Sequence, residues 1–444
     1  MKYLFVDNFR GFTKTLLPIR DVNFFVGENS TGKTSILDVI KLLDTPLFWF
    51  DQRFNSDEVK LGNYKDIVSV DSSDRSYFRI GWLDTEPQGK KANEDSGTIE
   101  ASLITFREEE GIPIISNYTT IVEGRQLNVI FGANTLKYKD EDLREISDDN
   151  DSIMNMFLSW AGSHQEIGKG YKTLKVPSER RQALIVISSI LYEEKRKHPK
   201  TIAAGFEFFV RRPFQEVVWL APIRTRPQRT YDTYRLDFSP EGEHTPYLIK
   251  KCLTKRTKEQ RKLADGFMRF IEKFGRDSGL FKSIAVKDYD PRSTTSPFEL
   301  DIILSNQALS IDNVGYGVSQ SLPLIVEIFA RTKDTWFAIQ QPEVHLHPRA
   351  QAALGAVMFE LAIAENKKFI VETHSDYTID GFRLNYRGKD IPKKPDSQIV
   401  FFERTQEGNI LHEIKILDNG EISDTQPQAY RDFFIKEQKR LLGL

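Results

Sequence analysis

A short glycine-rich run near the start of the sequence carries the clearest chemistry. Residues 27–34 read GENSTGKT, a full match to the phosphate-loop pattern G-x-x-x-x-G-K-[ST]. Glycines let backbone N–H groups turn toward phosphate oxygens, and a helix start adds favourable partial charge. Lys33 is expected to reach the β- and γ-phosphates, and the Thr34 hydroxyl to bind Mg²⁺. The predicted nucleotide-binding residues are Gly27, Glu28, Asn29, Ser30, Thr31, Gly32, Lys33, Thr34 and Ser35.

The flanking residues predict the elements that such a loop needs. Residues 22–26 form a short apolar run typical of a strand. From Thr34 onward, apolar residues recur at helical spacing. A chance glycine turn is the alternative, and the strand–turn–helix order argues against it.

Two later segments add candidate residues. Residues 314–321 read VGYGVSQS, a glycine turn that leads into an apolar helix, with Ser319 near its start. Serine is also an ordinary helix cap, so this run alone is ambiguous. It is followed by an apolar strand that ends in QQPEVHLHP at 340–348, and by a second strand that ends in THSD at 373–376.

This ordered set resembles the ABC-class P-loop ATPases of the SMC/RecF/OLD group. The likeness is strongest to bacterial AAA-type ATPases, including phage-defence ATPases, that carry a G-x-G-x-S-Q signature and an E-[EQ]-P-E-x-H-L-H-P Walker B segment. NFRGF at 8–12 and LAPIRTRPQR at 220–229 also resemble segments of these proteins. The resemblance covers residues 1–70 and 300–380 well and the middle thinly.

The resemblance implies a composite site that binds ATP and Mg²⁺ between two heads. Gly315, Gly317 and Ser319, with Gln320 beside them, would contact the γ-phosphate bound to the partner head. The implied catalytic set is Lys33, Gln340 at the position of the Walker B acid that helps hold Mg²⁺, Gln341 at that of the catalytic carboxylate, and His374 as the switch histidine.

His345 and His347 would face the dimer partner. Their H-x-H spacing also permits zinc, but Cys252 is the only cysteine and no companion ligands are evident.

Two amides therefore replace the expected acids. Glutamine carries no charge and cannot act as a general base, so ATP could drive assembly of the heads while turning over slowly. The open explanations are an engineered change, a natural slow ATPase, or a site in which Glu343 takes over. The last is disfavoured, because the intervening Pro342 should aim Glu343 elsewhere.

The sequence predicts an α/β fold: an ABC-type nucleotide-binding head with a mixed or parallel sheet, helices and an antiparallel β lobe, and an inserted, mainly helical region. Antiparallel strands are expected at 77–84, 99–107 and 126–131, helices at 183–195 and 259–274, and alternating strands and helices from 298 to 371. The expected boundaries are 1–135 for the first half of the head with its β lobe, 136–297 for the insertion, and 298–444 for the second half.

Composition limits the class of protein. The 444 residues have a net charge of -2, and no stretch approaches the about 18 apolar residues of a membrane span. We expect a cytoplasmic protein, since there is one cysteine and no secretion-signal pattern at the start. Two basic runs are candidate DNA contacts or simply solvated helix faces: Lys195, Arg196, Lys197 and Lys200; and Lys250, Lys251, Lys255, Arg256, Lys258, Arg261 and Lys262.

The leading functional hypothesis is a nucleotide-driven dimerisation switch, or a higher homo-oligomer of heads. It would act as the sensor subunit of a prokaryotic anti-phage system with a separate, nuclease-like effector. Residues after Asp376 are too few for a fused TOPRIM nuclease. The alternatives are a RecF/SMC-like ATPase that clamps DNA, a transporter ATPase, and a non-hydrolysing ATP-bound scaffold. The lack of a heptad pattern argues against an SMC protein, because its coiled-coil arm needs one.

Overall fold

The structure is a computed structural model of the 444-residue chain. It describes residues 1–85, 100–122, 125–132, 135–142, 150–162, 170–175, 212–214, 216–232, 235, 237–254, 257–290, 296–388, 391 and 393–434. The chain divides into two compact units, each described here by itself. Unit 1 comprises residues 1–20, 28–215 and 402–411, and unit 2 comprises residues 21–27, 216–401 and 412–444.

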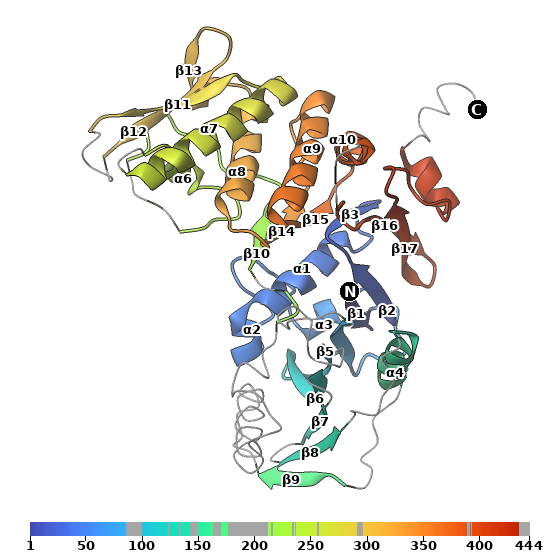
Figure 1. The fold of residues 1–444 in the computed structure, drawn as a ribbon. Coiled ribbons are helices and arrows are strands. Elements are labelled where there is room, and N and C mark those ends of the chain that lie inside the picture. The colour runs from blue at the N-terminus through green and yellow to red at the C-terminus, as the bar shows by residue number, and fades with distance from the viewer. Residues whose placement is uncertain are drawn as a thin grey trace. The chain divides into compact units, whose positions relative to one another are not determined.

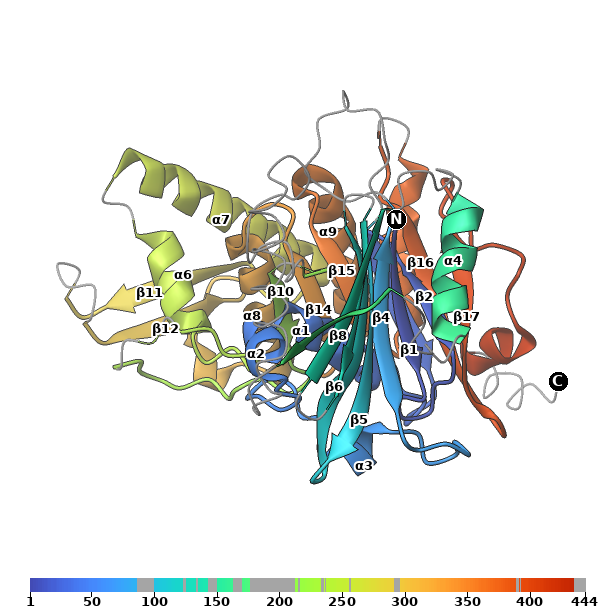
Figure 2. The same cartoon turned by 90° about the horizontal axis from the view of Figure 1, so that it is seen from below.

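Unit 1 is built on an antiparallel sheet, which Figures 1 and 2 show from two sides. Its strand order is β2-β1-β4-β5-β6-β7-β8-β9. The bounds are β1 Lys2–Asp7, β2 Thr15–Ile19, β4 Phe78–Asp84, β5 Glu100–Glu109, β6 Ile112–Val122, β7 Arg125–Phe131, β8 Thr135–Asp142 and β9 Lys172–Lys175. The three strands expected at 77–84, 99–107 and 126–131 are thus confirmed as β4, β5 and β7.

A helix covers part of this sheet. Helix α4 (Asn150–Gly162) brings Phe157 edge-on against Phe5 of β1, with 5.6 Å between ring centroids. Leu103 and Ile121 complete the buried cluster. Unit 1 also holds the shorter helices α2 (Pro46–Asp51) and α3 (Tyr64–Ile67), and α1 (Lys33–Asp44), whose start at the phosphate loop matches the prediction.

Unit 2 contains a sheet whose strand order is β10-β14-β15-β3-β16-β17. Strands β10 (Val217–Leu220), β14 (Trp336–Gln340), β15 (Lys368–Glu372) and β3 (Val22–Gly27) run parallel to one another. Each is almost fully buried, which explains why it reads as a continuous apolar run. The α/β class with a parallel sheet is confirmed, whereas β16 (Ser397–Thr405) and β17 (Gly408–Ile416) were not foreseen.

Helices and a small sheet complete unit 2. The helices are α6 Thr245–Leu253, α7 Lys258–Ser278, α8 Tyr316–Ala330, α9 Pro348–Glu365 and α10 Asp376–Arg383, with short 3-10 turns at Ile311–Asn313 and Leu384–Arg387. The small sheet joins β11 (Ser283–Asp288), β12 (Phe298–Ile303) and β13 (Ala308–Ser310). Helix is the main regular structure described between 136 and 297, alongside four strands; the helix expected at 183–195 lies outside the described residues.

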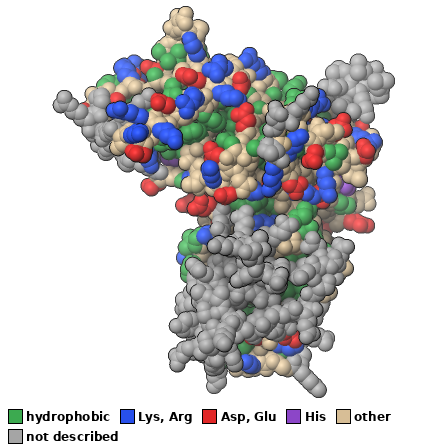
Figure 3. Space-filling view, in the orientation of Figure 1, with side chains coloured by type: hydrophobic (Ala, Val, Ile, Leu, Met, Phe, Trp, Pro, Cys, Tyr) green, Lys and Arg blue, Asp and Glu red, His purple; other side chains and the backbone are tan. Residues whose placement is uncertain are grey.

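The second basic run is only partly a free surface. Lys250 lies 3.0 Å from the carboxylate of Asp288 and donates to Ser296 at 3.0 Å. Lys258 and Lys262 are exposed on α7, and Figure 3 shows basic side chains interspersed with acidic ones over this region. Lys255 and Arg256, like the whole first run at 195–200, lie outside the described residues.

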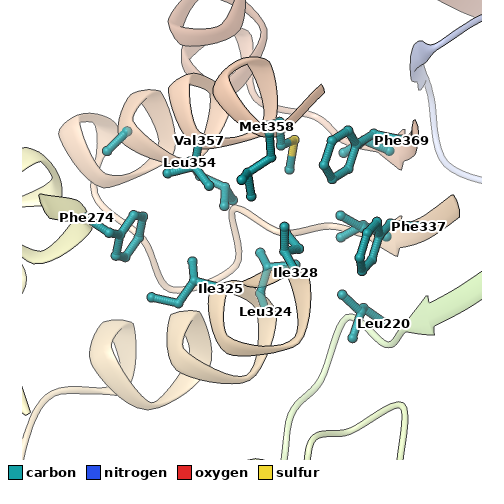
Figure 4. Close-up of a cluster of buried hydrophobic side chains, with 14 of the residues drawn as sticks. Leu220, Phe274, Leu324, Ile325, Ile328, Phe337, Leu354, Val357, Met358 and Phe369 are labelled. Carbon is teal, nitrogen blue, oxygen red and sulfur yellow. The ribbon is translucent and has the colours of Figure 1, made fainter. Parts of the chain in front are cut away.

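The core of unit 2 lies between the helices and the parallel sheet (Figure 4). Phe337 of β14 and Phe369 of β15 stack with 5.4 Å between centroids, and Met358 and Ile328 from α9 and α8 are fully buried in the same cluster. Helix α8 is buried on all sides from Val318 to Ile328, so that it lies inside this core rather than on its surface.

Helices α9 and α10 approach each other closely through two glycines. A Cβ on Gly355 of α9 would lie 2.1 Å from the carbonyl oxygen of Thr378, and one on Gly381 of α10 would lie 2.3 Å from that of Ala352. Both are backbone contacts that cannot yield by a rotamer change. Any larger residue at either position must therefore separate the helices.

Candidate functional site

The phosphate loop joins the end of β3 to α1. Gly32 has φ of 91° and precedes the first helical residue, Lys33. A Cβ at Gly32 would lie 2.5 Å from the ring of Phe12, so both its conformation and its surroundings require glycine. Ser30 is also left-handed, with φ of 62°. The predicted binding residues Glu28, Asn29, Ser30 and Thr34 are exposed, whereas Thr31, Lys33 and Ser35 are buried.

Lys33 is held inside the loop. Its side chain is only 3% exposed, and Nζ donates to the carbonyl oxygen of Glu28 at 2.7 Å. The Thr31 hydroxyl donates to the same carbonyl at 2.9 Å. The ammonium group is thus bent back over the loop, in the position from which it can meet a phosphate oxygen.

The N-F-R-G segment supports the start of α1. Arg10 has φ of 47°, and its guanidinium donates to Ser35 Oγ at 2.7 Å and lies 3.8 Å from Asp38. Ser35 therefore acts as a contact for Arg10 on the buried side of the helix. The resemblance drew attention to Arg10, but the sequence alone did not indicate this contact.

The carboxyl edge of the parallel sheet gathers the second group of residues. Gly27, Glu372 and Gln340 stand at or near the ends of the adjacent strands β3, β15 and β14. Gln340 Nε2 lies 3.5 Å from Glu372 Oε2, at the outer limit of a hydrogen bond. Gln341 has φ of 41°, and its N–H donates to the carbonyl of Glu372 at 2.8 Å. Glu372 is the carboxylate nearest Gln340 by these contacts, and sequence reasoning missed it.

The position of Glu343 corrects one expectation. We expected Pro342 to aim Glu343 away from the other site residues. Instead, the left-handed Gln341 turns the loop back, so that the Glu343 carboxylate accepts hydrogen bonds from Thr373 Oγ1 at 2.8 Å and from the His374 backbone N–H at 2.7 Å. Burial raises the pKa of Glu343 above its usual range.

His374 lies between this carboxylate and the start of α10. Its ring is half-buried and stacks on Phe433 with 6.4 Å between centroids. The next residue, Ser375, caps α10 by accepting from the N–H of Thr378 at 3.0 Å. The backbone on both sides of the histidine is therefore fixed, while part of its ring remains accessible.

The signature residues form the first turns of α8, which begins at Tyr316, so that Ser319 lies near the start of the helix as predicted. Gly315 is the N-cap residue, and the Ser319 hydroxyl donates to the Tyr316 carbonyl at 3.0 Å within the helix. A Cβ on Gly317 would lie 3.0 Å from the carbonyl of His345, so the signature turn packs directly on the H-x-H loop. The rings of Tyr316 and His345 lie 5.6 Å apart.

Gln320 points away from this surface. Its side chain is 4% exposed, accepts from the N–H of Arg224 at 3.1 Å and donates to the Arg224 carbonyl at 3.3 Å. It is therefore a structural link to the LAPIRTRPQR segment in this structure.

The zinc interpretation of H-x-H gains no support. His347 caps α9, where its ring nitrogen accepts from the N–H of Ala350 at 3.4 Å. Among the residues that the structure describes, no group of three histidine, cysteine, aspartate or glutamate side chains could hold a metal.

The donor set fits Mg²⁺ in part. Magnesium prefers oxygen ligands and usually takes one or two carboxylates besides water and phosphate. In unit 2 the Gln340 amide oxygen is a neutral donor, and Glu372 supplies a carboxylate next to Gln340. In unit 1 the Thr34 hydroxyl is a neutral donor on an exposed residue at the start of α1. Mg²⁺ in such a site neutralises charge on the phosphates.

Comparison with known proteins agrees with the phosphate-loop chemistry. The family model described as the AAA ATPase domain matches residues 1–379. A comparison with curated proteins finds no match. Within the described ranges, no helix is both long and apolar enough to cross a membrane.

Several solved structures are similar over most of both chains. One is an Smc head bound to the C-winged helix domain of ScpA, with 10% identity, coverage of 93% of this chain and 97% of that chain, and a TM-score of 0.44. Another is an Smc head with an extended coiled coil bound to the C-terminal domain of ScpA, derived from Pyrococcus furiosus, with 12% identity, coverage of 99% and 100%, and a TM-score of 0.44. The SMC head of Thermotoga maritima has 11% identity, coverage of 93% and 97%, and a TM-score of 0.36.

Proposed function

Because this chain belongs to the AAA ATPase domain family, we propose that it is an ATP- and Mg²⁺-binding switch in which two copies, or a higher homo-oligomer, assemble around bound nucleotide. The observation that carries the proposal is the phosphate loop, with left-handed Gly32 at the start of α1 and the Lys33 ammonium bent over the loop. Backbone N–H groups at a helix start and a fixed ammonium are a ready site for polyphosphate.

The surface around the signature turn supports assembly of two copies. Gly317 packs on the H-x-H loop, and the exposed ring of Tyr316 lies 5.6 Å from the exposed ring of His345 at a tilted angle. Exposed aromatic residues beside a glycine turn suit a protein interface, because rigid rings bury much area at low entropic cost. In the proposed dimer this surface would meet the nucleotide of the other copy through Gly315, Gly317 and Ser319.

Slow hydrolysis is part of the proposal. Gln340 and Gln341 cannot accept a proton from water, so turnover has to rely on neighbouring carboxylates. Glu343 is the better candidate, because burial raises the pKa of its carboxyl toward the working range of a general base and because it holds the backbone of His374. Glu372, beside Gln340, is better placed to bind a cation.

The proposed biological role rests on the motif resemblance. We infer a cytoplasmic sensor subunit of a prokaryotic anti-phage system that controls a separate, nuclease-like effector. ATP-driven assembly would hold the effector, and hydrolysis or a trigger would release it. Co-purification of an effector that is released by excess ADP would support this role.

The testing experiment measures ATP turnover and ATP-dependent mass by light scattering. It compares the parent chain, Gln340→Glu, and Lys33→Ala as the binding-deficient control. We expect the parent to assemble with ATP, Gln340→Glu to assemble and hydrolyse, and Lys33→Ala to do neither. Assembly without any turnover in Gln340→Glu would favour the ATP-bound scaffold instead. If Lys33→Ala behaved like the parent, the proposal would be wrong.

A DNA-clamping role is the second candidate, favoured only by the exposed basic residues on α7. Binding that requires ATP and weakens steeply with salt would support it, because phosphate contacts release counterions. Neutralising Lys258 and Lys262 should then reduce the salt dependence, whereas an unchanged slope would count against DNA contact through this helix.

A further inference from the structure

The LAPIRTRPQR segment contains a buried arginine that the proposed function does not use. Arg224 is 3% exposed, and in the described part of the chain none of its three guanidinium nitrogens has a hydrogen-bond partner. A buried charged group without such partners is strongly unfavourable. A buried polar group without partners requires an explanation, and a charged group with a strongly shifted pKa is a candidate for a functional site.

The negative group acting on Arg224 is Glu343. Burial lowers the pKa of the Arg224 guanidinium to about 10, and the charge of Glu343 opposes that shift. The guanidinium therefore remains charged at neutral pH. Its attraction to Glu343 is present although no hydrogen bond joins the two side chains.

The backbone of Arg224 is fixed to the signature helix. The Gln320 side chain bonds both to its N–H, at 3.1 Å, and to its carbonyl, at 3.3 Å. Gln320 directly follows Ser319 on α8 and is itself buried. A displacement of the first turns of α8 must therefore move Arg224 or break two buried hydrogen bonds.

Glu343 is fixed on its other side to the switch histidine. Its carboxylate accepts from Thr373 Oγ1 and from the N–H of His374. Thr373 and His374 thus already occupy the carboxylate whose charge acts on Arg224. Within unit 2, Gln320 is thus bonded to Arg224 and Glu343 to His374, and the charge of Glu343 acting on Arg224 links the two pairs.

We propose that Arg224 is a positioning residue that couples the signature helix to the switch histidine: when α8 moves, the Arg224 guanidinium binds the Glu343 carboxylate and draws it away from Thr373 and His374. In the present structure Glu343 holds the His374 backbone. In the coupled state the N–H of His374 is released, and the histidine is free to reorient. The proposal rests on the proposed function, because the event that moves α8 is engagement of the signature turn with nucleotide in the assembled protein.

The first test compares Arg224→Met with Arg226→Met, an exposed arginine two residues along. Hydrogen exchange of the peptide containing residues 373–375 is measured on the full chain with and without a non-hydrolysable ATP analogue, together with Tm and nucleotide affinity. In the parent and in Arg226→Met, nucleotide should increase exchange by about threefold or more. In Arg224→Met this increase should vanish while nucleotide affinity is kept. A lower Tm with the increase intact would identify Arg224 as merely structural and overturn the proposal.

A second test needs no nucleotide, so that it separates this proposal from the proposed function. Gln320→Leu breaks the bonds to the Arg224 backbone and should change exchange of the 373–375 peptide by about threefold in the nucleotide-free chain. The same change made in an Arg224→Met background should have no further effect. Equal effects in both backgrounds would overturn the coupling. If Gln320→Leu changed exchange only in the presence of Arg224 but ATP drove no assembly, the dimer switch alone would be overturned.

Discussion

The carboxylate of Glu343 and the backbone N–H of His374 are joined by a hydrogen bond of 2.7 Å, across two loops that lie thirty-one residues apart in sequence. The loop after β14 and the loop after β15 are therefore fixed to each other by one side chain. The Thr373 hydroxyl donates to the same carboxylate, so that removal of Glu343 affects two donors at once.

This relationship predicts different effects for two substitutions of Glu343. Glu343→Ala leaves the Thr373 hydroxyl and the His374 N–H without their acceptor and should lower the free energy of unfolding by about 1–3 kcal/mol. Glu343→Gln retains one acceptor oxygen and should cost less. Urea unfolding at pH 7 measures both. Equal losses would show that the hydrogen bonds contribute little.

An acid introduced at position 340 should make stability depend on Mg²⁺. Glu372 Oε2 lies 3.5 Å from the Gln340 amide, so Gln340→Glu places two carboxylates side by side. Like charges at this separation destabilise each other unless a cation or proton intervenes. Without Mg²⁺ the Gln340→Glu variant should have a lower Tm than the parent, and millimolar Mg²⁺ should restore its Tm. The Tm of the parent, in which Gln340 is uncharged, should change little when Mg²⁺ is added.

Gln340→Glu combined with Glu372→Gln is the matched control for this Mg²⁺ effect. It keeps one carboxylate at the edge and should lose the dependence on Mg²⁺. If the double variant responded like Gln340→Glu alone, the two side chains would not act on each other.

Stability should fall in acid through Glu327 of α8. Its side chain is 1% exposed; although burial acts to raise its pKa, the hydrogen bond from His244 at 2.8 Å and the charge of Arg331 hold it below the usual value of 4.5. The unfolded chain therefore binds a proton at Glu327 more readily, and stability present above about pH 4.5 is lost as pH falls through the folded-state pKa.

The variant Glu327→Gln should remove this acid dependence and cost about 3 kcal/mol at pH 7, because Arg331 loses its buried counter-charge and the hydrogen bond of His244 loses its carboxylate partner. Urea unfolding of both proteins at pH 7, 5 and 4 gives the comparison. A constant difference across that range would mean that Glu327 is not the titrating group.

Substitution of the signature glycine Gly317 should weaken ATP-driven assembly without lowering stability. In Gly317→Ala, the added Cβ lies 3.0 Å from the His345 carbonyl and must displace the H-x-H loop, while alanine favours the helix by up to about 1 kcal/mol. We expect little change in Tm but at least tenfold weaker ATP-driven assembly. Gly266→Ala, in the open middle of α7, is the control for helix propensity and should leave assembly unchanged. Equal assembly of the two variants would remove Gly317 from the interface.

Local chemistry was predictable from the sequence, and contacts made across the fold were not. The phosphate loop needs glycine, lysine and threonine at fixed offsets between a strand and a helix. The run GENSTGKT therefore predicted the preceding strand, the following helix and a phosphate-binding role. Strands β14 and β15 were likewise predicted from short apolar runs. The domain boundaries and the roles of the signature and Walker B residues remain predictions.

Glu372 and Arg224 illustrate what was missed. Glu372 ends an apolar strand and becomes significant only because β15 pairs with β14, which no local pattern encodes. Arg224 stands among several charged residues of one segment, and only the fold shows that it is the buried one. The predicted direction of the Glu343 side chain was wrong, because the sequence did not indicate the left-handed backbone conformation of Gln341.

The close approach of α9 and α10 at Gly355 and Gly381 has a kinetic consequence. Because backbone meets backbone there, the two helices cannot slide independently, and a rotation of α9 must carry the start of α10 with it. The H-x-H loop precedes α9, and His374 precedes α10. Spectroscopic probes placed on the two loops should therefore report a single shared relaxation time rather than two successive ones.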